Sequence, residues 1–148
     1  NIMIDRLQSD LKNALKNSEK ERLNALRNLI SKIKSEEIEK GEPLTDDECL
    51  KVCIRNAKQI KESISQFEKG DRQDLADKEK IELDIISSYL PEELPDEELI
   101  KIIEDVINNM SANGSSDMGK VMGPVMGKIA GQADGKRVQK LVLKQLNK

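Results

Sequence analysis

The stretch Pro91-Glu92-Glu93-Leu94-Pro95 decides how this chain of 148 residues is organised. Proline has no backbone N–H, and it disfavours helix both at its own position and at the residue before it. Two prolines four positions apart therefore predict a stiff, non-helical connector. We expect a domain boundary here, with an N-terminal domain over residues 1–91 and a C-terminal domain over residues 95–148.

On both sides of this connector, apolar residues recur every three or four positions, which is the spacing of one face of an α-helix. No segment shows the alternation typical of a strand. The fold class that we expect is all-α, with an N-terminal domain of about four helices and a small C-terminal domain of three helices. The chain has one Phe, one Tyr and no Trp, so the core must consist of Leu, Ile, Val and Met.

Several residues predict where the helices of the N-terminal domain begin and end. Two pairs match the capping box, in which a hydroxyl residue and a glutamate three positions later satisfy each other's backbone N–H groups. These pairs are Ser18 with Glu21, before the second helix, and Thr45 with Glu48, before the third. We expect the second helix to end near Gly41, and the third to end at Gly70 in the left-handed conformation.

The C-terminal domain carries comparable signals. Ser116 or Asp117 is expected to cap the sixth helix, Pro124 to kink or shorten it, and Asp134 to cap the seventh. Within the sixth helix, a methionine recurs at every fourth position and is followed each time by a glycine. This stripe suits either an adaptable groove for a partner or a close-packed helix pair in which glycine admits a neighbouring backbone. The close-packed pair is favoured, because apolar stripes on helices usually belong to the core.

The composition argues against several classes of function. The chain has no histidine, which is the usual general base near neutral pH, and no glycine-rich phosphate-binding loop after a strand. We therefore expect no catalytic residues, no cofactor and no enzymatic activity of the chain alone. Cys49 and Cys53 lie four residues apart in a helical pattern, where a disulfide would strain the helix. No second pair of cysteines completes a metal site with them. Reduced thiols and the lack of a long apolar stretch predict a cytoplasmic protein without a membrane association.

The charge of the chain is unevenly distributed. Residues 115–148 contain seven basic and two acidic residues, a net charge of +5, whereas the whole chain has a net charge of −3. In the last predicted helix, five basic residues fall within an arc of about 120°. Such a stripe suits contacts with phosphates, although a solvated face explains it equally well. The candidate RNA-binding residues are Lys136, Arg137, Lys140, Lys144 and Lys148, together with Lys120 and Lys128.

Two motifs near the C-terminus resemble a known family. The stretch Asp117-Met-Gly-Lys-Val-Met-Gly123, followed by Gly131-Gln-Ala-Asp-Gly-Lys136, is similar to the tail domain of GatB, one component of the glutamine-dependent aspartyl/glutamyl-tRNA amidotransferase. The same domain occurs in the small stand-alone YqeY-like proteins. Upstream, Leu26-Arg-Asn-Leu-Ile30 and Tyr89-Leu-Pro-Glu-Glu-Leu94 also resemble the YqeY-like family, so the likeness covers nearly the whole chain.

This resemblance implies a tail that helps to hold tRNA while the catalytic parts of the amidotransferase lie elsewhere. The leading hypothesis is therefore a tRNA-binding accessory module, with tRNA or another structured RNA as partner. A second hypothesis is a protein-interaction adaptor, in which the acidic N-terminal domain docks a partner and the tail merely packs. Amidotransferase or other translation-related proteins are the candidate partners. A third, a carbon–nitrogen ligase with glutamine as amido-N-donor, follows from the family likeness alone.

Overall fold

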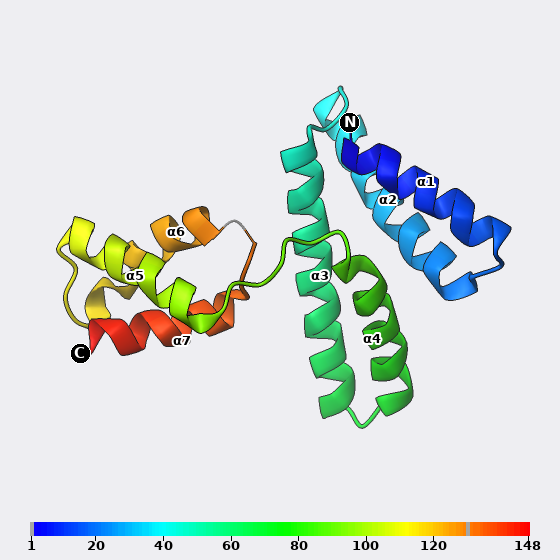
Figure 1. Ribbon diagram of the computed structural model, residues 1–148. Coiled ribbons are helices and arrows are strands. Elements are labelled where there is room, and N and C mark those ends of the chain that lie inside the picture. Colours follow the sequence, from blue (N-terminus) through cyan, green and yellow to red (C-terminus); the bar gives the residue numbers. More distant parts are fainter. Residues whose placement is uncertain (1, 130) are drawn as a thin grey trace. The chain divides into compact units, whose positions relative to one another are not determined.

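The computed structural model describes residues 2–129 and 131–148, and over these ranges the chain is helical with no β-strand. This confirms the expected all-α class. The helices form two compact units, Asn1–Leu90 and Pro91–Lys148 (Figure 1). The first unit contains α1 (Ile2–Lys16), α2 (Lys20–Lys40), α3 (Asp46–Lys69) and α4 (Gln73–Ser87). The second contains α5 (Asp96–Met110), a 3-10 turn (Ser115–Asp117), α6 (Met118–Ile129) and α7 (Gly135–Leu146).

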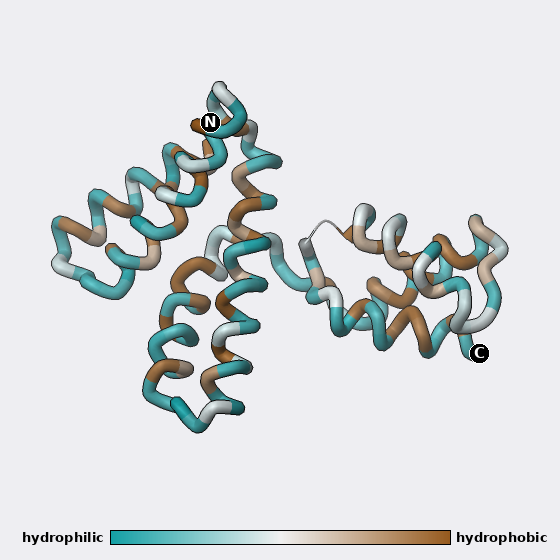
Figure 2. Tube along the Cα trace, turned by 180° about the vertical axis from the view of Figure 1, so that it is seen from behind, coloured by the Kyte–Doolittle hydropathy of each residue, from teal (hydrophilic) through white to brown (hydrophobic). Residues whose placement is uncertain are grey.

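The N-terminal unit consists of two helical hairpins. Helix α1 packs on α2, and α3 packs on α4, while α2 also contacts both helices of the second hairpin. Hydrophobic positions recur between hydrophilic ones along each helix, as amphipathic helices require (Figure 2). All four helices contribute to one core, whose larger members include Leu7, Leu26, Leu29, Ile33, Ile60 and Ile86.

The C-terminal unit is a three-helix arrangement in which α5, α6 and α7 all contact one another. Each helix buries three aliphatic side chains at helical spacing. They are Leu99, Ile103 and Val106 on α5, Val121, Val125 and Ile129 on α6, and Val138, Val142 and Leu146 on α7. This regular pattern fixes which face of each helix is left to the solvent.

One of the two predicted capping boxes is present. At the start of α3, the Thr45 hydroxyl accepts from the Glu48 N–H at 3.2 Å, and the Glu48 carboxylate accepts from the Thr45 N–H at 3.0 Å. The box predicted for Ser18 is wrong, because α2 begins at Lys20 and follows Glu19 without a side-chain cap. Ser18 has a φ of 56° and closes α1, where the next N–H bonds back to the Ala14 carbonyl at 2.9 Å. The short turn between α1 and α2 thus uses Ser18 to end one helix rather than to begin the next.

The predicted helix ends are partly correct. Gly41 ends α2 with a φ of 81°, as expected. At the end of α3, however, Gly70 has a φ of −85°, and the left-handed residue is Asp71, with a φ of 57°. The left-handed position therefore falls one residue later than predicted, at an aspartate, which tolerates this conformation better than most residues do.

In the C-terminal unit, Asp134 caps α7 as predicted, since its carboxylate accepts from the Lys136 N–H at 3.3 Å. Ser116 and Asp117 lie in the 3-10 turn, and the Asp117 carboxylate accepts from the Asn113 N–H at 2.9 Å. Helix α6 continues through Pro124 to Ile129.

The Met/Gly stripe of α6 differs from the close-packed helix pair that its pattern predicts. The three methionines, Met118, Met122 and Met126, are half-buried against the core. The glycines that follow them, Gly119, Gly123 and Gly127, lie on the exposed face, and a Cβ added to any of them would meet no atom within 4 Å. These glycines therefore do not admit a neighbouring helix of this chain.

Candidate RNA-binding surface

The orientation of α7 is set by its buried face. Val138 and Val142 are completely buried, and the opposite side of the helix presents three exposed lysines, Lys136, Lys140 and Lys144. Lys148, just beyond the helix, is exposed as well. We call these four residues the lysine face. Successive members on the helix are four residues apart, so they follow one another at a rise of about 6 Å.

The lysine face carries positive charge without local compensation. Across residues 2–129 and 131–148, none of its four side chains forms an ion pair or a side-chain hydrogen bond with an acidic residue. Elsewhere, by contrast, Lys40 contacts Glu48 and Lys80 contacts Glu68. The lysine face can therefore offer all of its ammonium groups to an external polyanion.

Arg137 does not share this freedom, although the sequence placed it in the same stripe. Its guanidinium donates twice to one Asp96 carboxylate oxygen, at 2.6 and 2.9 Å, and once to the Leu94 carbonyl, at 2.7 Å. The Glu93 carboxylate is 4.0 Å away. Arg137 thus ties α7 to the residues that lead into α5. Charge periodicity alone could not distinguish this role from that of a free surface cation.

The remaining predicted residues lie on α6. Lys120 and Lys128 are both exposed. Lys120 is 3.8 Å from the Asp117 carboxylate, and its side chain remains 76% exposed, so this contact compensates its charge only weakly.

The cysteines agree with the prediction of reduced thiols. Cys49 and Cys53 are buried thiols, and burial, together with the neighbouring Cys49, raises the pKa of Cys53 to about 11. They therefore behave as small apolar residues of the core. In the part of the chain that the structure describes, no cluster of three or more potential ligands could hold a metal ion. None of the described helices combines the length and apolar character that crossing a membrane requires.

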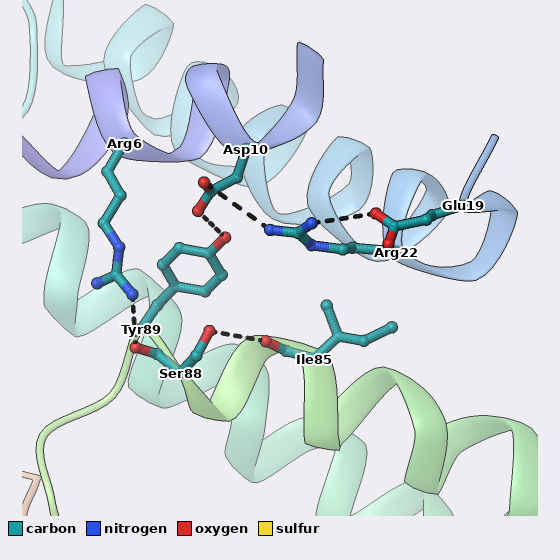
Figure 3. A network of polar contacts seen from close by, with 7 residues as sticks. All are labelled: Arg6, Asp10, Glu19, Arg22, Ile85, Ser88 and Tyr89. Atoms are coloured by element: carbon teal, nitrogen blue, oxygen red, sulfur yellow. Dashed lines mark hydrogen bonds and ion pairs between the residues drawn. The ribbon is translucent and has the colours of Figure 1, made fainter. Parts of the chain in front are cut away.

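A polar network in the N-terminal unit was not predicted from the sequence (Figure 3). The Tyr89 hydroxyl, just after α4, donates to the Asp10 carboxylate of α1 at 2.5 Å, and Arg22 of α2 lies 3.8 Å from the same carboxylate. The Arg6 guanidinium lies 4.5 Å from the centre of the Tyr89 ring and donates to the Ser88 carbonyl. Burial and then the bond to Asp10 raise the pKa of Tyr89 to about 12. The network fastens the end of α4 to the first hairpin.

Comparison with known proteins places the chain in a family. The model of the family described as Yqey-like protein matches residues 4–146. Among curated proteins, the chain is 37% identical over 92 residues to "Altered inheritance of mitochondria protein 41, mitochondrial" of Pyrenophora tritici-repentis, covering 60% of this chain and 49% of the relative. The protein of the same name from Candida glabrata is 35% identical over 94 residues, covering 62% and 52%. An uncharacterised protein of Schizosaccharomyces pombe is 30% identical over 86 residues, covering 58% and 70%.

The matched region spans about half the length of the first two relatives. Their names describe mitochondrial proteins, so they lend no support to the cytoplasmic location that the reduced cysteines suggested. The match to the family model, in contrast, extends over nearly the whole sequence. The chain belongs to the YqeY-like family.

Proposed function

We propose that the C-terminal unit binds structured RNA, tRNA in the first place, through the lysine face. The observation that carries this proposal is the set of four exposed lysines that have no acidic partner among the residues the structure describes, on a chain whose net charge is −3. Residues 115–148 carry a net charge of +5 and the remainder of the chain −8, so a polyanion is attracted to this segment and repelled by the rest on average. The family resemblance also implies RNA binding by this C-terminal unit.

The chemistry of the lysine face favours contacts with the backbone of the RNA. Lysine ammonium groups bind phosphates as point charges and supply affinity without reading sequence. Residues 115–148 contain no aromatic residue on which a single-stranded base could stack. We therefore expect recognition of shape and phosphate position, as for folded RNA, rather than recognition of base identity.

The proposal is tested by replacing Lys136, Lys140, Lys144 and Lys148 together with glutamine and titrating bulk tRNA at two salt concentrations. Arg137 stays in place because it holds the C-terminal unit together through Asp96 and Leu94. Affinity for tRNA should fall, and the slope of log affinity against log salt should decrease by about one unit for each phosphate that the protein no longer binds. The fold should be retained, since exposed substitutions usually change the free energy of unfolding by less than about 0.5 kcal/mol.

A matched control is available on α3. Lys51, Lys58, Lys61 and Lys69 are also four exposed lysines on one helix, and none forms an ion pair within the described ranges. Their joint replacement by glutamine removes the same total charge. If this control weakens tRNA binding as much as the lysine-face variant does, the proposed surface is misplaced. If the unsubstituted chain fails to bind tRNA even at low salt, the proposed function is wrong.

A further inference from the structure

A groove follows helix α2 of the N-terminal unit from Lys20 to Glu36. Its first section is bordered by α4 and shares Asn28 and Glu82 with a middle section of about 390 Å³. The middle section, bordered by α3 and α4, shares Lys32 with a last section beside α3. Neighbouring sections share lining residues, so they lie in succession along α2. At 1.5 Å per residue, the α2 wall is about 24 Å long.

Two rows of amide and hydroxyl side chains line this path. The row on α2 consists of Asn24, Asn28, Ser31 and Ser35, and the row on α3 consists of Asn56, Gln59 and Ser63. In each row, consecutive members are three or four residues apart, so each row occupies a single face of its helix. Amides and hydroxyls can both donate and accept hydrogen bonds, as backbone peptide groups do.

The middle of the groove contains a polar group whose hydrogen bonding is incomplete. Asn56 is 2% exposed, and its Oδ1 accepts from the ammonium of Lys32. Its Nδ2 has no hydrogen-bond partner among the described residues. Lys32 also donates to Gln59 Oε1 at 3.3 Å, so this single side chain bridges α2 and α3. A buried donor without an acceptor is unfavourable, so a carbonyl that reached Asn56 Nδ2 once the Lys32 side chain had moved away would form a favourable hydrogen bond.

We propose that this groove binds an extended polypeptide segment of a partner protein through hydrogen bonds to the backbone of that segment. Residues four apart on a helix are separated by a rise of about 6 Å, which is close to the repeat of about 6.6 Å between alternate residues of an extended chain. Side chains on α2 can thus meet successive outward-facing peptide groups. In the bound state the Lys32 side chain leaves Asn56, the Asn56 Nδ2 donates to a carbonyl of the segment, and the Asn56 Oδ1 accepts from a backbone N–H of the segment in place of Lys32.

The lining of the groove disfavours the other occupants. A helical segment has already satisfied its own backbone groups and needs an apolar groove, whereas eight of the nine residues around the middle section are polar. A nucleic acid would meet Glu79 and Glu82 there. The first section adds Ile81, which is 41% exposed and offers a place for one apolar side chain of the segment. This inference concerns the N-terminal unit and does not depend on RNA binding by the C-terminal unit.

The probe for this proposal is a displayed library of random linear heptapeptides, selected against the whole chain. Selected peptides are synthesised, and their affinities are measured by fluorescence anisotropy for the unsubstituted chain and for the double variant Asn28→Ala/Gln59→Ala. Both substituted residues are exposed and leave the core untouched. We expect the double variant to bind at least tenfold more weakly, and Asn56→Leu to do the same if it folds. Methylating alternate backbone nitrogens of the peptide should also abolish binding, because the backbone makes the contacts.

The matched control is Gln8→Ala/Asn13→Ala, which removes one glutamine and one asparagine from exposed positions on α1. This variant should bind the peptides like the unsubstituted chain. Four results would overturn the proposal: a selection without binders, equal binding by the groove variant, a gain of helical circular dichroism when the peptide binds, or unchanged binding of the methylated peptide. Self-association that only the groove variant loses would assign the groove to a second copy of the chain.

Discussion

The interiors of the two units are built differently. Among its described residues, the C-terminal unit buries only aliphatic side chains, three from each of its helices together with Ala133. The N-terminal unit buries Asn56, two thiols and Tyr89 beside its aliphatic residues. An aliphatic interior offers no side-chain hydrogen-bonding groups, so a charged ligand of the C-terminal unit would bind on its outer face. In the N-terminal unit, polar groups reach between the helices, and a binding site can lie in the groove that they line.

The sharpest test of whether the two units have separate cores is to substitute one core residue in each unit. Ile103 in the C-terminal unit and Leu29 in the N-terminal unit are both completely buried. Replacing either with alanine should destabilise its own unit by about 2–5 kcal/mol, because transfer free energy and packing are both lost. Hydrogen exchange resolved by residue should show the loss of protection on one side of Pro91-Glu92-Glu93-Leu94-Pro95 only.

Limited proteolysis gives a second measurement of the same division. Cleavage between Leu90 and Asp96 should leave one helical fragment on each side of the connector. If Ile103→Ala lowered the protection of α1 to α4 as much as that of α5 to α7, the two cores would be one cooperative unit and the comparison between them would fail.

A smaller effect is expected from removing the Tyr89 hydroxyl, the centre of the polar network in the N-terminal unit. Tyr89→Phe keeps the ring beneath Arg6 but loses the hydrogen bond to Asp10. A hydrogen bond to a charged group contributes about 1.5–3 kcal/mol, and we expect a loss near the lower end because Arg22 still compensates Asp10. Urea unfolding at neutral pH measures this difference.

The dependence on pH separates the hydroxyl from the packing of the ring. An unfolded tyrosine has a pKa near 10, whereas the pKa of Tyr89 in the folded chain is raised to about 12. The protonated hydroxyl therefore stabilises the fold fully below pH 10, and this contribution is lost as the pH rises from 10 to 12. The stability difference between the unsubstituted chain and Tyr89→Phe should shrink over that window. A constant difference would mean that neither burial nor the hydrogen bond to Asp10 raises the pKa of Tyr89 above that of an unfolded tyrosine.

Local patterns in the sequence predicted the helices well, because an amphipathic helix depends on residues three and four positions apart. The same patterns failed where the relevant partner is distant in sequence. Arg137 fits the stripe of cations, yet its partners Leu94 and Asp96 lie more than 40 positions away. Tyr89 and Asp10 are 79 positions apart. The prediction that the glycines of α6 admit a neighbouring helix was wrong for a related reason, since a helix pattern does not reveal which face a neighbour covers.

The smallest predicted change in the free energy of unfolding comes from the two predicted capping boxes. They look alike in the sequence, but only the one at Thr45 is present in the structure. Thr45→Ala should destabilise the N-terminal unit by about 1 kcal/mol, because the Glu48 N–H loses its acceptor at the start of α3. Ser18→Ala should change the free energy of unfolding by only a few tenths of a kcal/mol, because its side chain caps no helix and its left-handed backbone strains serine and alanine alike. Urea unfolding of the two variants in parallel measures the difference. Equal losses would show that Ser18 caps α2 in solution, and the turn between α1 and α2 would then differ from the one described.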